Sequence, residues 1–210
     1  MTTLIVHGTP ISTYVRTVRL LLEEANAAYE LKDVSIFNGD TNSAEYRAKH
    51  PFGKVPTLEA DGNIIYETAA ITEYLDEVVA THKFSPADSL LKARMRQIMA
   101  IVDSYLYAPA IGTIVIQRLI VPSQGGTPDE DRIQGAIAPL TTAINAIEAL
   151  ATGTPYLLGS TLTLADFYLI PIFIYLSKTP EFETVMPQAP KLKAWWEEVN
   201  KLPIVQKVCG

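Results

Sequence analysis

Short apolar runs alternate with amphipathic stretches through the first third of the chain. Residues 4–6 form an apolar run that a Gly-Thr-Pro turn follows, which predicts a buried strand. Apolar residues then recur at helical spacing, with Ser12 or Thr13 as the capping hydroxyl of a helix. Residues 29–35 alternate roughly between apolar and polar and predict a second strand. The chain is therefore expected to begin as strand, helix, strand.

A hairpin signal follows this first part. Residues 43–49 predict a short helix, after which Asp61-Gly62-Asn63 separates two β-prone runs, residues 57–59 and 64–66. Residues 68–79 then have the pattern of a helix. The order β-α-β-α-β-β-α describes a small sheet with helices packed on it.

The hydrophobic pattern changes after residue 82, and the later segments have a helical period. Residues 89–119 predict one long helix that can bend at Pro109, and residues 129–150 predict another. The pattern predicts three parts: an α/β domain over residues 1–81, a linker over residues 82–88 and an all-helical domain over residues 89–210.

One more helix start in the second part has a specific signature. Thr163 and Asp166 have the spacing of a capping box, and the residues that follow, 167–176, are apolar nearly all round. This helix is expected at the centre of the helical domain. We interpret Asp166 as a folding residue rather than a substrate contact, because a capping box stabilises a helix start.

The composition is that of an ordinary globular protein with a mild negative charge. The 210 residues are 48% hydrophobic and 19% charged, with a formal net charge of −6, so the chain lacks the basic surface of a nucleic-acid-binding protein. The N-terminus has no signal-peptide pattern, and the most apolar segment, residues 167–176, is shorter than the roughly 20 residues of a membrane span. We therefore expect no nucleic-acid or membrane partner and a cytoplasmic location.

Cysteine and histidine usage argues against a redox or metal centre. Cys209 is the only cysteine, which excludes an internal disulfide, a CxxC pair and a thiolate metal cluster. The three histidines, His7, His50 and His82, have no metal-ligand spacing. We expect no metal site.

The most informative stretch surrounds the predicted hairpin. Pro56 stands immediately before a short strand and removes an amide donor there, which is tolerated where the backbone of the preceding Val55 serves an extended peptide ligand. Glu67 and Thr68 open the next helix and add a carboxylate, a hydroxyl and unpaired amides. Together these groups predict a cradle for a small peptide that carries an amine and carboxylates.

Three segments resemble the cytosolic glutathione transferase family along essentially the whole chain. They are HGTPISTYVRTVRLLLEE, HPFGKVPTLEADGNIIYETAAITEYL and LLGSTLTLADF, and the pattern is that of a theta- or phi-like, bacterial-type member. The resemblance implies a thioredoxin-like domain that binds glutathione and a helical domain that shapes the pocket for a small hydrophobic electrophile. It also implies a homodimer and a cis peptide bond before Pro56.

The resemblance carries roles over to individual residues. The backbone of Val55 would pair with the cysteinyl part of glutathione as an added strand does. Glu67 and Thr68 would hold the γ-glutamyl amine and carboxylate, and Lys54 would reach the glycine carboxylate. Ser12 matches the hydroxyl residue that activates the thiol.

The chemistry expected of Ser12 follows from the thiol itself. A free thiol has a pKa of about 8.5, so a small fraction is ionised at neutral pH. A hydroxyl donor and the positive end of a helix stabilise the thiolate, and lowering the pKa by ~2 units requires ~2.7 kcal/mol. Ser12 could instead only cap the helix, and Tyr14 or Thr13 could be the activating hydroxyl. These alternatives stay open.

Some positions depart from the family pattern. Thr68 stands where the family usually has serine, and Thr41 and Asn42 stand where phi-like members have a His-Lys pair that helps bind the glycine end. Asp103 could cross a dimer interface to the γ-glutamyl amine or belong to a solvated helix face. The residues that could line the electrophile pocket, or serve packing, are Tyr107, Ile111, Val115 and Arg118.

These observations predict conjugation of glutathione to small hydrophobic electrophiles. Peroxide reduction or dehalogenation would use the same activated thiol. A glutathione-binding carrier with little turnover is an alternative of another class, which the departures at Thr41, Asn42 and Thr68 keep open. A helical scaffold without glutathione binding would be expected to lose the cradle, and this chain has kept most of it.

Overall fold

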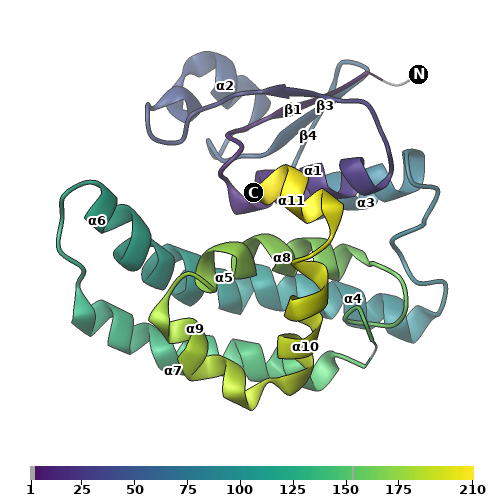
Figure 1. The fold of residues 1–210 in the computed structure, drawn as a ribbon. Helices are drawn as coiled ribbons and strands as arrows, with labels where there is room; N and C mark the ends of the chain where they lie inside the picture. Colours follow the sequence, from purple (N-terminus) through teal and green to yellow (C-terminus); the bar gives the residue numbers. More distant parts are fainter. Residues whose placement is uncertain (1–2, 153) are drawn as a thin grey trace. The chain divides into compact units, whose positions relative to one another are not determined.

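The protein divides into two compact units. A computed structural model describes residues 3–152 and 154–210 (Figure 1). One unit comprises Met1–Phe84 together with Pro203–Gly210, and the other comprises Ser85–Leu202. We refer to them as unit 1 and unit 2.

Unit 1 is the expected α/β domain, built on a four-stranded sheet. Its strands are in the order β2-β1-β3-β4, with β1 and β2 parallel and the other pairs antiparallel. The elements are β1 (Leu4–His7), α1 (Thr13–Glu24), β2 (Glu30–Lys32), a 3-10 turn (Asp40–Asn42), α2 (Ala44–Lys49), β3 (Thr57–Ala60), β4 (Asn63–Tyr66) and α3 (Thr68–Val78). The predicted order is confirmed, although β2 is shorter than the run expected to form it.

Local signals account for the hairpin and the packing beneath it. Asp61 and Gly62 have φ values of 49° and 82°, as a two-residue hairpin turn with a right-handed twist requires. Val6 and Leu58 point to the same side of the sheet and are fully buried. Figure 1 shows α1 and α3 together on one side of the sheet, and α2 lies apart from them. The alternation of the strands thus places their apolar residues under two helices.

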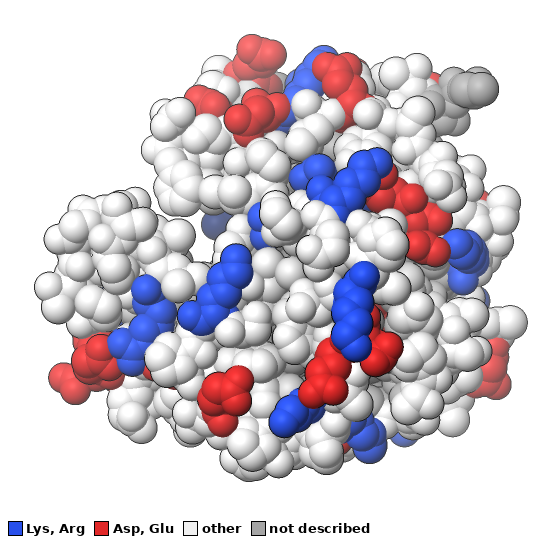
Figure 2. All heavy atoms as spheres, viewed as in Figure 1, with Lys and Arg blue, Asp and Glu red and all other residues white. Residues whose placement is uncertain are grey.

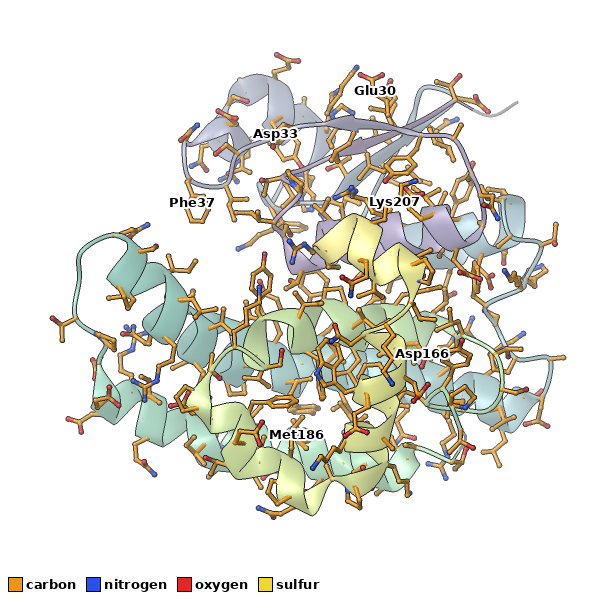
Figure 3. All side chains as sticks on the ribbon, viewed as in Figure 1. Glu30, Asp33, Phe37, Asp166, Met186 and Lys207 are labelled. Atoms are coloured by element: carbon orange, nitrogen blue, oxygen red, sulfur yellow. The ribbon has the colours of Figure 1, made fainter. Side chains whose placement is uncertain are left out.

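The last helix of the chain also belongs to unit 1. Helix α11 (Pro203–Cys209) packs on α1, and the Lys207 ammonium lies 2.6 Å from the Glu23 carboxylate (Figures 1 and 3). The sequence pattern predicts these residues to belong to the helical domain, residues 89–210. No local signal indicates that they return to the sheet domain, because the contact joins residues 184 positions apart.

Unit 2 is all-helical in its described residues. The predicted long helix is confirmed and runs to Ser123, four residues beyond the predicted end at residue 119. Pro109 lacks an N–H, which interrupts the regular hydrogen-bond ladder, and π-helical segments lie on both sides of it. The elements are α4 (Ser89–Ile101), a π segment (Val102–Leu106), α5 (Tyr107–Pro109), a second π segment (Ala110–Ile120), α6 (Val121–Ser123), α7 (Glu130–Leu150), α8 (Leu164–Leu176), α9 (Pro180–Val185), a 3-10 turn (Met186–Gln188) and α10 (Pro190–Val199).

The centre of unit 2 is α8, as its composition predicts. All but one of its residues are buried, and the capping box of Thr163 and Asp166 is present at its start. Helices α4 and α10 and the second π segment pack against α8. An apolar helix of this kind is stable only inside a protein core or a membrane.

The expectation that no apolar segment is as long as a membrane span is wrong. The helix Ser89–Ser123 is long and apolar enough to cross a membrane by length and composition, with a mean hydropathy of 1.5 over its best 18 residues. Residues 167–176 are the more apolar stretch, as expected, but the longer run was not expected, because charges are scattered along its first turns. In the structure 44% of that window is buried, and α7 and α8 pack along the helix. Packing inside unit 2 thus accounts for its apolar side.

Charges of both signs share the surface. Figure 2 shows Lys and Arg side chains interspersed with Asp and Glu side chains on the face in view, with no broad field of one sign there. This distribution agrees with the small net charge of −6.

Candidate functional site

The sheet register gathers three segments at one edge of unit 1. Thr57, the first residue of β3, lies opposite His7 at the end of β1 and opposite Tyr66 at the end of β4. Because β3 is antiparallel to both neighbours, its start and their ends lie at the same edge of the sheet. The residues just after β1, just before β3 and just after β4 are the ones singled out from the sequence.

A close approach fixes two of these segments against each other. A Cβ atom at Gly8 would collide with Cγ2 of Val15 and would lie 3.2 Å from Cβ of Val55. The turn between β1 and α1 therefore packs directly on the residue before Pro56, and only glycine leaves the room. Ser12 ends that turn.

Ser12 has a hydroxyl that the fold does not use. It is the N-cap residue of α1, half-buried, and its C=O accepts a hydrogen bond from Arg16 N at 2.9 Å. Its side chain makes no capping hydrogen bond, and within the described chain the first turn of α1 holds no acidic residue. A donor hydroxyl thus stands at the positive end of a helix, which suits an anion.

The two rival hydroxyls lie further into the helix. Thr13 is the first residue of α1 and is buried, and Tyr14 is the second and is half-buried.

Val55 presents unpaired backbone before a cis proline. The bond between Val55 and Pro56 is cis, as the resemblance implied. Neither the N–H nor the C=O of Val55 has a hydrogen-bond partner among the residues that the structure describes. The N–H and C=O of such a residue, just before β3, can pair with the backbone of an extended peptide as those of a strand would.

Glu67 and Thr68 stand at the start of α3 in an unusual backbone. Glu67 is the N-cap residue with φ 71° and ψ 119°, it is exposed, and its carboxylate does not cap the helix. A non-glycine residue in this region costs free energy and is found at binding sites. Thr68 is 9% exposed and is the first helical residue. The carboxylate is available to a cation, and the first amides of α3 to an anion.

Helix α2 places a cation beside the loop before β3, one that the sequence pattern did not single out. Lys54 is exposed, whereas Thr41 is buried and the Asn42 side chain accepts a hydrogen bond from Arg47 Nη2 at 2.9 Å. Arg47 also donates to the Pro51 carbonyl at 3.0 Å, and its guanidinium borders Gly53. Arg47 lies on a helix face with no marked signal, so only the folded loop brings it near Lys54.

A buried histidine lies between the two sides of the cradle, the loop with Lys54 and Val55 and the segment that ends in Glu67. His50 is 2% exposed and its ring contacts those of Tyr46, Phe52 and Tyr66, with 5.0 Å between the centroids of His50 and Tyr66. Its Nδ1 atom is buried without a hydrogen-bond partner in the described structure. Burial lowers the pKa of His50, and the nearby Glu67 carboxylate opposes that effect.

The lowered pKa of His50 predicts acid destabilisation. As the pH falls through about 6.5, the unfolded chain binds a proton on this residue before the folded protein does, so stability is lost until the lowered pKa of the folded state is reached. The slope is at most about 1.4 kcal/mol per pH unit for one histidine. Urea unfolding at pH 7.5 and 5.5 measures it, and His50→Asn is expected to reduce the difference. Exposed His82→Asn is the control; an equal reduction in both variants would contradict this assignment.

The remaining candidates belong to unit 2. Asp103 is exposed on the first π segment, Tyr107 is half-buried, and Ile111 and Val115 are buried. Arg118 donates to the carboxylates of Glu130 and Glu181 at 2.6–2.9 Å, and these bonds raise its pKa well above the usual range. The Arg118 guanidinium is thus engaged within unit 2. Among the described residues no three His, Cys, Asp or Glu side chains are placed to hold a metal ion.

Comparisons with known proteins match both parts of the chain. The family model for the glutathione S-transferase N-terminal domain matches residues 11–78, and that for the C-terminal domain matches residues 130–198. Glutathione S-transferase F13 of Arabidopsis thaliana is 30% identical over 207 residues, which cover 96% of this chain and 93% of that protein.

Solved structures are similar over nearly the whole length. Glutathione transferase F7 from Populus trichocarpa has a TM-score of 0.84 and 33% identity, covering 98% of this chain and 97% of that one. Glutathione S-transferase I from maize, in complex with an atrazine glutathione conjugate, has a TM-score of 0.83 and 28% identity, covering 99% and 96%. Both units of this chain thus have counterparts in single proteins of known structure.

Proposed function

The chain belongs to the glutathione S-transferase family, and from that premise we propose that it is a theta- or phi-like, bacterial-type member that binds glutathione in the unit 1 cradle. It is a glutathione transferase, an enzyme that joins the glutathione sulfur to electrophiles. The single observation that supports the site assignment is a set of polar groups that make no hydrogen bond within the described chain and lie where β1 and β4 end and β3 begins. They are the Ser12 hydroxyl, the Val55 backbone and the Glu67 carboxylate.

These groups match the chemistry of glutathione part by part. The Val55 backbone offers one donor and one acceptor to the cysteinyl residue. The Glu67 carboxylate suits the γ-glutamyl amine, and Thr68 with the first amides of α3 suits the γ-glutamyl carboxylate. Lys54, exposed and next in the chain to Gly53, which the Arg47 guanidinium borders, suits the glycine carboxylate. The departure at Thr41 and Asn42 is offset in this assignment, because Asn42 holds Arg47 in place.

Ser12 would act as a hydrogen-bond donor and not as a base or a nucleophile. The thiol proton leaves to solvent, and the Ser12 hydroxyl with the start of α1 stabilises the thiolate that remains. The sulfur electron pair then forms a bond to the electrophilic carbon, and the leaving group departs with its own electron pair. Holding the two reactants side by side supplies a large part of the acceleration.

The second substrate and the assembly are also part of the proposal. A maize relative holds an atrazine glutathione conjugate, and we propose small hydrophobic electrophiles as the class for this chain. We further propose a cytoplasmic homodimer in which Asp103 approaches the γ-glutamyl amine of the partner's site. Peroxide reduction or dehalogenation by the same thiolate, and a carrier role, are the alternatives.

Replacing Glu67 tests the cradle. Wild-type protein is expected to be retained on immobilised glutathione and to turn over chlorodinitrobenzene. Glu67→Gln is expected to raise KM for glutathione about 10- to 100-fold, the loss of one hydrogen bond to a charged group. Glu77→Gln, on an exposed face of the same helix, is the matched control.

Each outcome of that test is decisive for a different part. Flow-through of the wild type with no measurable affinity would refute the binding proposal. Retention without turnover would favour the carrier role. Equal KM values for Glu67→Gln and Glu77→Gln would remove Glu67 from the site.

A further inference from the structure

One buried phenol brackets the segment that carries the unpaired backbone. Tyr46, in α2, is 5% exposed, and its hydroxyl donates to the Lys54 carbonyl at 2.7 Å. The same oxygen lies 3.1 Å from Thr57 Oγ1. The phenol has a single O–H to donate, and the Lys54 carbonyl accepts that hydrogen bond. The Thr57 hydroxyl is therefore the donor in the contact with the phenol oxygen. Tyr46 therefore contacts the residue before Val55 and the residue after Pro56.

That segment has few other hydrogen bonds to hold it. Pro56 has no N–H, and the Val55 N–H and C=O are unpaired within the described chain. The β3 ladder begins only at Thr57. The orientation of the peptide unit between Lys54 and Val55 thus depends on the phenol that binds its carbonyl.

Peptide geometry gives this contact a consequence for the ligand. In a trans peptide the C=O and the following N–H lie in one plane and point in opposite directions. The bond between Lys54 and Val55 is not among the cis bonds of the described chain. With the Lys54 carbonyl directed at the buried Tyr46, the Val55 N–H is directed away from α2.

We propose that Tyr46 is a positioning residue for glutathione, one that orients the Val55 amide toward the cysteinyl part of the tripeptide by binding the Lys54 carbonyl. This inference rests on the proposed function, since it assumes that the Val55 backbone binds glutathione. Tyr46 itself does not touch the substrate.

The surroundings of the phenol support the role. Burial raises the pKa of Tyr46, which keeps the phenol protonated at neutral pH and able to donate. Its ring stacks on His50 at 6.5 Å with 18° between the planes, and His50 contacts Tyr66, the neighbour of Glu67. One packed row of rings thus joins the two sides of the cradle.

Tyr46→Phe tests the inference, because it removes the hydroxyl and keeps the ring. KM for glutathione is expected to rise about threefold to tenfold, the loss of one neutral hydrogen bond. The value of kcat at saturating glutathione and KM for chlorodinitrobenzene are expected to change less than about twofold, since the reacting groups stay in place. Thr57→Val, which removes only the hydroxyl that binds the phenol, is expected to shift KM for glutathione in the same direction by less.

The chain offers a matched control in the same unit. The Tyr29 phenol is half-buried, accepts from Arg19 and donates to Glu23, each at 3.1 Å, away from the cradle. Tyr29→Phe is expected to leave KM for glutathione unchanged, even if both variants lower the thermal midpoint equally.

The possible results separate this inference from the function it rests on. Wild-type protein without affinity for glutathione would refute the binding proposal and this inference with it. Wild-type affinity with equal KM values in Tyr46→Phe and Tyr29→Phe, or a fall in kcat at unchanged KM, would overturn only the role of Tyr46. If Tyr46→Phe does not fold, an unchanged KM in Thr57→Val overturns that role.

Discussion

Ser12→Ala is expected to lower kcat/KM for glutathione about 10- to 100-fold at pH 6.5. The variant loses the side-chain donor at the start of α1, and one hydrogen bond to a charged group is worth about 1.5–3 kcal/mol, or roughly one to two pKa units of the thiol. The deficit should shrink as the pH rises past about 8.5, where the free thiol ionises without help. The pH profile of kcat/KM, together with the thiolate absorbance of bound glutathione, measures both effects.

Stability separates this role from simple helix capping. A capping serine contributes about 1 kcal/mol, but the Ser12 side chain makes no capping hydrogen bond, so Ser12→Ala is expected to change the free energy of unfolding by less than about 0.5 kcal/mol. Ser12→Thr should restore most of the activity, and Tyr14→Phe should keep it. Full activity of Ser12→Ala across the pH range would assign the thiol to another hydroxyl.

The parts of the fold that the sequence predicts depend on local signals. The turn at Asp61 and Gly62 needs positive φ values that these residue types tolerate, so this dipeptide between two β-prone runs is enough to predict the hairpin. The capping box of Thr163 and Asp166 is equally local. The cradle could be predicted for the same reason: Val55, Pro56 and Glu67 flank one hairpin, and a hairpin brings its two ends together.

Contacts that no local sequence signal marks could not be predicted in this way. Arg118 meets Glu181 across 63 positions, and Tyr46 meets Lys54 only because a short helix folds back over the start of β3. Neither pair has a periodic pattern or a turn signature. A tyrosine in an amphipathic helix is an ordinary core residue in the sequence, and its hydroxyl acquires a partner only in the fold.

Asp166→Ala is expected to cost unit 2 about 3–5 kcal/mol, much of the stability of a typical domain. The carboxylate is fully buried and accepts four hydrogen bonds of 2.7–3.0 Å, from the N–H groups of Leu157 and Thr163, the Thr163 hydroxyl and the Trp195 indole (Figure 3). Alanine leaves these buried donors without an acceptor; one unpaired donor costs about 1–3 kcal/mol, and the four costs do not add, because the groups are neighbours and water can enter the space that the carboxylate leaves. Urea unfolding followed by tryptophan fluorescence measures the loss.

The loss of stability should depend on how deeply the carboxylate is buried and on how many acceptor oxygens remain. Two further variants test these two dependences. Asp129 also caps a helix, accepting from Arg132 N at 3.1 Å, but it is exposed, so Asp129→Ala is expected to cost only about 1 kcal/mol. Asp166→Asn keeps one acceptor oxygen and sets an amide group against the Thr163 N–H, which should place it between the two alanine variants. If Asp166→Ala lost no more stability than Asp129→Ala, the buried carboxylate would be an ordinary helix cap, and the start of α8 would be held by apolar packing alone.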